Sequence, residues 1–134
     1  MLKVVGTSAV MSDTPSGSEE ASPKNKARVI VIEDDERLRS YAIAALAGAE
    51  EIEIVGDAGN LAAGLPLVDL MPDLALLDLG LPDGSGISVI EAMREKVPGC
   101  RILVFTVFED KASVLGTLKA GADGYILKDT SAEM

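Results

Sequence analysis

The sequence predicts an α/β fold built on a doubly wound, five-stranded parallel sheet, and two patterns support this prediction. From Ala27 onward, short apolar runs alternate with segments of helical period, which is typical of right-handed βαβ units and a mainly parallel sheet. Four of the apolar runs also end directly in charged or hydroxyl residues. We expect strands centred on 28–33, 52–56, 73–78, 101–106 and 124–127.

Helices are predicted in the segments between these strands. Apolar residues at i, i+3, i+4 and i+7 spacing mark three of them: Leu38, Tyr41, Ala42, Ala45, Leu46 and Ala49; Ile87, Ile90, Met93 and Val97; and Val114, Leu115, Leu118 and Ala122. Asp110 is available to cap the last of these helices. A weaker helix would run from about Asn60 to Leu70, but Pro66 lacks the amide that a helical ladder needs, so we expect this helix to be kinked, late or short.

The composition indicates a single domain preceded by a leader. The chain has 134 residues and 48% hydrophobic content, which is enough for one core and too little for two ordinary domains. Residues 1–26 are rich in Ser, Gly, Pro, Glu and Lys, and they offer little apolar surface to offset the entropy of ordering. We therefore predict a disordered leader over 1–26 and a folded domain over 27–134.

Charge and residue usage exclude several classes of function. The 22 acidic and 12 basic residues give a net charge of -10, which repels nucleic acid and anionic membrane surfaces, so we expect this chain to bind neither directly. Because there is no histidine, a Ser-His-Asp site, a His-ligated zinc site and an internal phosphohistidine relay are excluded, and any metal must be held by oxygen. Cys100 is the only cysteine, which fits a reducing compartment and a small buried hydrophobe. No apolar run approaches the roughly 20 residues of a membrane span, so we expect a cytoplasmic protein.

The last five residues contain a signal for the start of a helix. Thr130-Ser131-Ala132-Glu133 fits a capping box, in which the threonine and the glutamate satisfy each other's backbone amides at a helix start. We expect the fifth helix to be truncated or missing. An apolar sheet face beside the last strand would then be exposed or covered by a partner element.

Polar residues at the strand ends predict a functional site. Asp78 follows Leu74–Leu77, Glu33 and Asp34 follow the first strand, Thr106 ends the fourth, and Lys128 ends the fifth. In a parallel sheet of order 2-1-3-4-5, ligands bind beyond the carboxyl ends of the strands at the switch point between strands one and three. We therefore expect the three carboxylates to converge there.

Converging carboxylates call for a cation. Their mutual repulsion raises at least one pKa unless a cation lies between them. With oxygen ligands alone, the fitting ion is Mg²⁺, or Mn²⁺. Given a phosphoryl donor, Asp78 could act as a nucleophile and form an acyl phosphate, with Lys128 supplying a positive charge. Thr106 could hydrogen-bond the phosphoryl group and move toward it, and Tyr125 could follow that movement.

Four motifs lie in order at the ends of four predicted strands: Val31-Ile32-Glu33-Asp34, Leu77-Asp78-Leu79-Gly80-Leu81-Pro82-Asp83-Gly84-Ser85-Gly86, Phe105-Thr106, and Gly121-Ala122-Asp123-Gly124-Tyr125-Ile126-Leu127-Lys128. Through these motifs the chain resembles, from Arg28 to Asp129, the receiver domain of bacterial two-component response regulators. The stretch from Gly121 to Asp129, in which Asp129 follows the lysine, resembles the subfamily of receivers that precedes a LuxR-type helix-turn-helix.

The resemblance implies a flavodoxin-like fold and a role in phosphorelay signalling. It implies that a sensor histidine kinase phosphorylates Asp78, with Mg²⁺ bound by Asp34, Asp78 and the Gly80 carbonyl and assisted by Glu33. The phosphorylated protein would switch its strand 4, helix 4 and strand 5 surface and control a transcriptional output domain. Homodimers would form through helix 4 and strand 5, or through the uncovered face near the last helix.

Two other functions remain open. A degenerate receiver would act as an unphosphorylated protein-interaction module. An Mg²⁺-dependent phosphohydrolase with an aspartyl nucleophile would usually need a second acid two residues after Asp78, where this chain has Gly80. We therefore expect a signalling domain rather than an enzyme.

Overall fold

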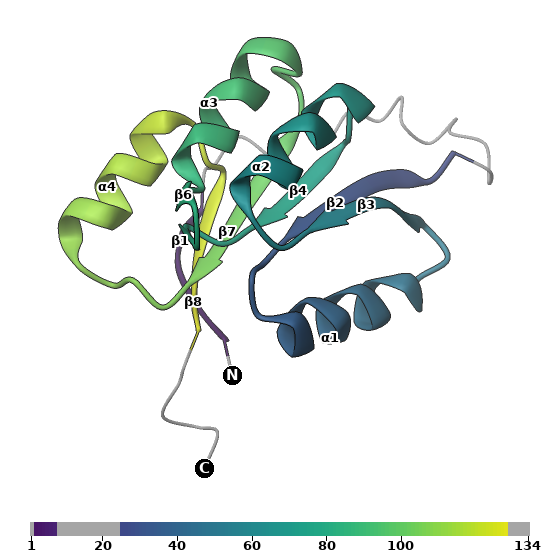
Figure 1. The fold of residues 1–134 in the computed structure, drawn as a ribbon, viewed down its shortest axis with the longest axis horizontal. Helices are drawn as coiled ribbons and strands as arrows, with labels where there is room; N and C mark the ends of the chain where they lie inside the picture. Colours follow the sequence, from purple (N-terminus) through teal and green to yellow (C-terminus); the bar gives the residue numbers. More distant parts are fainter. Residues whose placement is uncertain (1, 8–24, 129–134) are drawn as a thin grey trace.

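Five parallel strands form the centre of the fold. The structure is a computed structural model and describes residues 2–7 and 25–128. Within these residues the parallel strands are β2 (Ala27–Ile32), β3 (Ile52–Ala58), β4 (Leu74–Leu77), β7 (Arg101–Thr106) and β8 (Gly124–Lys128). They lie side by side in the order β3-β2-β4-β7-β8 (Figure 1). This is the predicted order 2-1-3-4-5, and the predicted strand positions are confirmed to within two residues.

The central strands are buried on both faces. Val29, Ile30, Val31 and Ile32 of β2 are completely buried, as expected for a parallel strand with structure above and below it. β2 pairs with β3 on one side and with β4 on the other. This strand therefore fixes the position of the acidic residues that follow it.

Helices cover the two faces unequally. α1 (Glu36–Ala47) lies on one face, whereas α2 (Leu61–Gly64), the 3₁₀ helix η3 (Leu65–Leu70), α3 (Ile87–Lys96) and α4 (Lys111–Ala120) lie on the other (Figure 1). Pro66 lies in the first turn of η3, and the second helix is short, as expected: a single α-turn followed by a 3₁₀ segment. The predicted cap of α4 is confirmed, because Asp110 accepts from the Ser113 amide at 2.9 Å.

The α1 face leaves an apolar hollow open beside the last strands. The hollow measures about 360 Å³. Apolar side chains of α1, β4, β7 and β8 line it: Leu38, Tyr41, Ala42, Ala45, Leu46, Leu76, Phe105 and Ile126. Tyr41 is 72% exposed, although the helical pattern placed it on the packed side. An exposed apolar patch was expected here, and the predicted start of a fifth helix at Thr130 lies outside the described residues.

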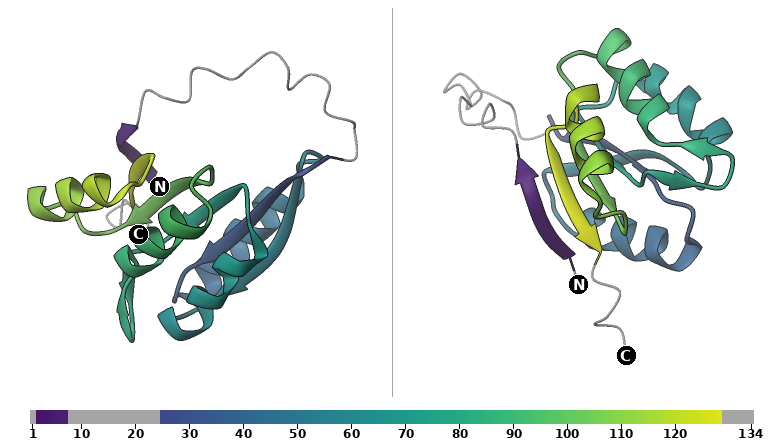
Figure 2. Two further views of the ribbon diagram at one scale, coloured as in Figure 1. Left: turned by 90° about the horizontal axis from the view of Figure 1, so that it is seen from above. Right: turned by 90° about the vertical axis from the view of Figure 1, so that its left-hand side faces the viewer.

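One strand was not expected. Leu2–Thr7 forms β1, which pairs antiparallel with β8 and adds a sixth strand to the sheet (Figure 2). The prediction of a disordered leader over 1–26 therefore differs from the structure at 2–7. The exposed edge of β8 offers backbone hydrogen-bond partners to a segment that is far away in the sequence. The prediction of disorder was based on local residue composition, which gives no information about such distant pairing. Residues 8–24 of that prediction lie outside the described residues.

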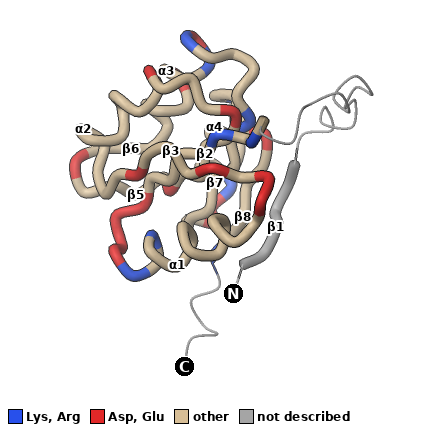
Figure 3. Tube along the Cα trace, turned by 90° about the vertical axis from the view of Figure 1, so that its right-hand side faces the viewer, with Lys and Arg blue, Asp and Glu red and all other residues tan. Residues whose placement is uncertain are grey.

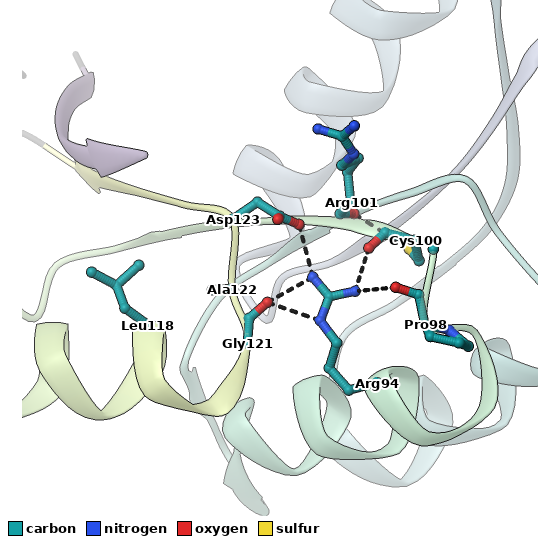
Figure 4. A pocket seen from close by; sticks show the side chains of 9 residues that line it. Arg94, Pro98, Cys100, Arg101, Leu118, Gly121, Ala122 and Asp123 are labelled. Carbon is teal, nitrogen blue, oxygen red and sulfur yellow. Dashed lines mark hydrogen bonds and ion pairs between the residues drawn. The ribbon is translucent and has the colours of Figure 1, made fainter. Parts of the chain in front are cut away.

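A guanidinium group joins the ends of α3, β7 and β8. Arg94 of α3 donates to the carbonyl oxygens of Gly121, Pro98 and Cys100 and pairs with Asp123 at 2.8 Å (Figure 4). Gly121 has φ +122°, and a Cβ there would lie 2.8 Å from Cγ of Arg94. A side chain at this position would therefore both strain the turn and displace the arginine.

The single thiol is expected to be chemically silent in the folded protein. Cys100 is buried as predicted, and burial raises its pKa to about 11. At pH 8 the thiolate fraction is then on the order of 0.1%, and access is also blocked. A chromogenic disulfide reagent should react slowly with the native protein and at once in denaturant. Fast reaction in the native protein at pH 8 would contradict the buried position.

No helix in the described part of the chain is long and apolar enough to cross a membrane.

Candidate functional site

The polar residues predicted at the strand ends meet in one hollow of about 390 Å³. It lies beyond the carboxyl ends of β2, β4, β7 and β8. The hollow is lined by the predicted acidic, hydroxyl and amine residues together with their neighbours: Glu33, Asp34, Asp35, Leu38, Asp78, Gly80, Thr106, Val107, Phe108 and Lys128. Parallel strands end at the same edge of the sheet, which explains why residues so distant in sequence converge.

Three carboxylates form a cluster that could hold a metal ion. One oxygen from each of Glu33, Asp34 and Asp78 lies within 4.8 Å of the others. Glu33 and Asp78 are buried, whereas Asp34 is exposed at the mouth of the hollow. A run of acidic positions leads from this cluster into α1 (Figure 3). An oxygen donor set with an open, solvated side suits Mg²⁺, which keeps several of its waters.

Lys128 joins two of these carboxylates. Its Nζ donates to Glu33 Oε1 at 2.7 Å and to Asp78 Oδ2 at 2.9 Å. The ammonium also lies 4.8 Å from the centre of the Phe105 ring, which stabilises a cation that has been partly removed from water. Burial opposes the charged form of Lys128, but its hydrogen bonds to Glu33 and Asp78 outweigh this and raise the pKa of the ammonium.

Glu33 is the most deeply buried carboxylate of the cluster. Burial raises the pKa of its carboxyl above the usual value, and the charge of Asp78 adds to the rise, although the hydrogen bond from Lys128 acts in the opposite direction. A raised carboxyl pKa was predicted from repulsion among the acids. The main cause is instead desolvation, because Glu33 follows a strand that is buried on both faces.

The neighbouring acid Asp35 caps a helix instead of joining the carboxylate cluster. Its carboxylate accepts from the amides of Arg37 and Leu38 at 2.9 and 3.1 Å and so caps α1. These hydrogen bonds lower the pKa of Asp35. Of the acidic run after β2, this residue therefore serves the helix rather than the cluster.

The loop after Asp78 is held on both sides. Gly80 donates its amide to Asp78 Oδ1 at 3.2 Å, and a Cβ at Gly86 would collide with the Asp78 carbonyl oxygen. β5 (Gly80–Leu81) and β6 (Gly84–Ser85) form a small hairpin. At its turn, Asp83 accepts from the amides of Leu61 and Ala62 at the start of α2, at 2.6 and 2.9 Å. The loop is thus fastened to a helix outside the site.

Thr106 and Tyr125 lie behind the carboxylates on β7 and β8. Both are completely buried. Thr106 Oγ1 has no hydrogen-bond partner among the residues that the structure describes. The Tyr125 hydroxyl donates to the Phe108 carbonyl oxygen at 2.6 Å, and burial, with Asp110 and Asp78 nearby, raises its pKa to about 12. A buried hydroxyl that lacks a partner can still form a new hydrogen bond.

Three residues at the site escaped the sequence prediction. Phe105 lies against the Lys128 ammonium. Arg39 of α1 donates to the Glu33 carbonyl oxygen at 2.6 Å and pairs with Asp57 of β3. The ring of Phe108 lies 3.2 Å from where a Cβ on Gly80 would be. The sequence shows that Phe108 lies two residues after Thr106, but the contact between Phe108 and Gly80 depends on the path of the loop after β7.

Comparison with known proteins identifies the family. The model of the response regulator receiver domain matches residues 29–134. The nitrate/nitrite response regulator protein NarL of Escherichia coli is 39% identical over 113 residues, which is 84% of this chain and 52% of NarL. The transcriptional activator DevR/DosR of Mycobacterium tuberculosis is 34% identical over 76% of this chain and 48% of the relative. This chain therefore spans about half the length of these relatives.

A solved structure agrees with the fold. The receiver domain of NarL from Mycobacterium tuberculosis has a TM-score of 0.72 and 35% identity, covering 78% of this chain and 86% of that one. This likeness confirms the flavodoxin-like fold. Receiver domains are signalling modules that bind Mg²⁺ at an acidic cluster and interact with histidine kinases. The chain belongs to the family of response regulator receiver domains, and its relatives include NarL and the transcriptional activator DevR/DosR.

Proposed function

We propose that Asp78 is the phosphoacceptor and that Mg²⁺ is held by Asp34, Asp78 and the Gly80 carbonyl oxygen, with assistance from Glu33. One observation carries this proposal: Lys128 bridges Glu33 and Asp78 within a cluster whose three carboxylates lie within 4.8 Å. Such a site holds more negative charge than one ammonium can neutralise. It therefore favours a divalent cation and, with that ion, an incoming phosphoryl group.

The transfer step follows from the chemistry of a buried carboxylate. One Asp78 oxygen attacks the phosphorus of a phosphohistidine on a sensor kinase. The P–N bond breaks, its electron pair stays on the imidazole, which takes a proton from solvent, and the new P–O bond leaves an acyl phosphate. Bound Mg²⁺ would offset charge on the phosphoryl oxygens. Lys128, already 2.9 Å from Asp78, would pair with one of them.

Thr106 and Tyr125 are the residues that would change their hydrogen bonds when Asp78 is phosphorylated. The Thr106 hydroxyl would donate to a phosphoryl oxygen and gain the partner that it lacks. Because the Tyr125 hydroxyl is bonded to Phe108, two residues after Thr106, a shift of this loop would break that bond and release Tyr125. The change would reach the surface formed by β7, α4 and β8.

The outcome of the switch depends on the rest of the protein. The segment that this chain shares with its relatives covers only about half of their length, and these relatives include proteins named as DNA-binding or transcriptional regulators. We propose that the switched surface controls a transcriptional output domain and supports homodimers, and that the protein works in the cytoplasm.

Addition of Mg²⁺ and beryllium fluoride, a non-transferable phosphoryl mimic, tests this proposal. In amide NMR spectra, we expect large shifts at Asp78, Thr106 and Tyr125, and none of these shifts in Asp78→Asn. If the spectrum is unchanged, the chain acts instead as an unphosphorylated interaction module.

The Asp34→Ala substitution should weaken Mg²⁺ binding. Asp34 supplies one of the oxygens in the cluster but is exposed, so its loss removes a ligand without opening the core. A smaller negative charge should also stabilise the metal-free protein. We expect at least about tenfold lower Mg²⁺ affinity in calorimetric titration.

Asp35→Ala is the matched control for Asp34→Ala. It removes the same charge one residue later, but this carboxylate caps α1. It should lower the melting temperature and leave Mg²⁺ affinity nearly unchanged. Equal Mg²⁺ affinity in Asp34→Ala and the parent protein would overturn the assignment of Asp34 as a ligand.

A further inference from the structure

The pairing between β1 and β8 closes a sheet edge that the five parallel strands alone would leave open. β8 is the last strand of the parallel set. Its outward backbone amides and carbonyls would otherwise present an unpaired row, which is a template for a strand from another chain. In the structure Leu2–Thr7 takes this place, alongside the full length of β8 (Figure 2).

The register shows that coverage is complete. Leu2 is opposite Lys128 and Thr7 is opposite Gly124, which are the last and first residues of β8. The ladder therefore ends beside the lysine that contacts Glu33 and Asp78.

β1 becomes the new edge strand of the sheet, and its backbone is irregular. The register shifts between Val4 and Gly6, so β1 contains a bulge. A bulge increases local twist and interrupts the row of backbone groups, which is a common protection of edge strands. A regular, pairing-competent edge on β8 is thus replaced by a bulged edge on β1.

Chain length allows β1 to pair within its own molecule. Residues 8–24 separate β1 from the part of the chain that enters β2. Seventeen residues can reach roughly 55 Å, whereas the path from β1 across β8, β7 and β4 to β2 is only about 19 Å at normal strand spacing. Tethered strands meet at an effective concentration on the order of 1 mM. Intramolecular pairing should therefore prevail at ordinary protein concentrations.

We propose that Leu2–Thr7 is an intramolecular edge strand that prevents β8 from pairing with β8 of a second copy of this chain. Loss of β1 from the edge would open a self-association surface made of main-chain hydrogen bonds. This surface is distinct from the apolar hollow on the α1 face.

Cysteine pairs test where β1 lies. Lys3 is directly opposite Leu127, so Lys3→Cys/Leu127→Cys should form a disulfide within one molecule under mild oxidation. Lys3→Cys/Ile126→Cys is the control, because successive strand residues point to opposite faces. Cys100 is buried and will not interfere. Disulfides only between molecules, or equal yields in the two variants, would overturn the intramolecular strand.

Proline substitution tests what β1 does. Lys3→Pro/Val4→Pro removes two consecutive amides, one of which must face β8, and Lys3→Thr/Val4→Thr keeps both amides and strand propensity. In sedimentation velocity, the proline variant should form a defined dimer at concentrations where the threonine variant is monomeric. In hydrogen exchange at dilutions where it is monomeric, alternate β8 amides should exchange at least about tenfold faster. The same oligomeric state in both variants would overturn the guarding role, and unchanged exchange would overturn the pairing itself.

Discussion

Asp78→Asn should abolish phosphorylation and leave the fold intact. The amide is nearly isosteric with the carboxylate. Its single oxygen can still accept one of the two hydrogen bonds that Asp78 receives, either from Lys128 at Oδ2 (2.9 Å) or from the Gly80 amide at Oδ1 (3.2 Å). The amide cannot attack phosphorus, because its nitrogen lone pair is delocalised and its oxygen carries no full charge. Incubation with acetyl phosphate and Mg²⁺ should give a phosphorylated species for the parent protein and none for the variant, as measured by intact mass spectrometry.

A matched aspartate elsewhere controls for loss of charge. Asp69→Asn removes one negative charge from an exposed side chain that pairs with Lys96. This variant should be phosphorylated like the parent protein. If Asp78→Asn still accepts phosphate at the parental rate, then Asp78 is not the acceptor.

Arg94→Met should be the most destabilising of the substitutions considered for this domain. The guanidinium donates to three carbonyl oxygens and pairs with Asp123, and methionine keeps most of the apolar stem while removing every donor. Removing the guanidinium leaves partly buried carbonyl oxygens without donors and the Asp123 carboxylate without its counter-charge. We expect this to lower the free energy of unfolding by about 2–4 kcal/mol. Urea denaturation should report this loss as a lower midpoint with an unchanged slope.

Lys96→Met provides the comparison on the same helix. Lys96 and Asp69 form an ion pair whose side chains are 59% and 65% exposed, and exposed pairs contribute little to stability because water screens them. The midpoint should therefore change far less than in Arg94→Met. Similar losses in the two variants would show that the Arg94 network does not join α3 to the β7 and β8 ends as described.

The sequence predicted those parts of the fold that depend on local pattern. Apolar runs located the strands, and Pro66 foretold the short second helix. The direction of parallel strands brought Asp34, Asp78 and Lys128 to one edge. These features need only the order of residues and general geometry.

Features that depend on contacts between distant segments were not predictable in this way. Leu2–Thr7 forms a strand because the β8 edge is available more than 100 residues away. The role of Arg94 depends on carbonyl oxygens that two turns expose, and carbonyl groups have no signature in a sequence. The main cause of the raised Glu33 pKa was also missed, because burial follows from the packing of β2 rather than from the spacing of acids.

Mapping the modified residue tests the central claim most directly. After reaction with acetyl phosphate and Mg²⁺, borohydride reduction converts an aspartyl phosphate to homoserine, and tandem mass spectrometry locates it. We expect homoserine at position 78 and at no other aspartate. Homoserine at Asp34, or at no position in a protein that binds Mg²⁺ normally, would contradict the assignment of Asp78 as the phosphoacceptor.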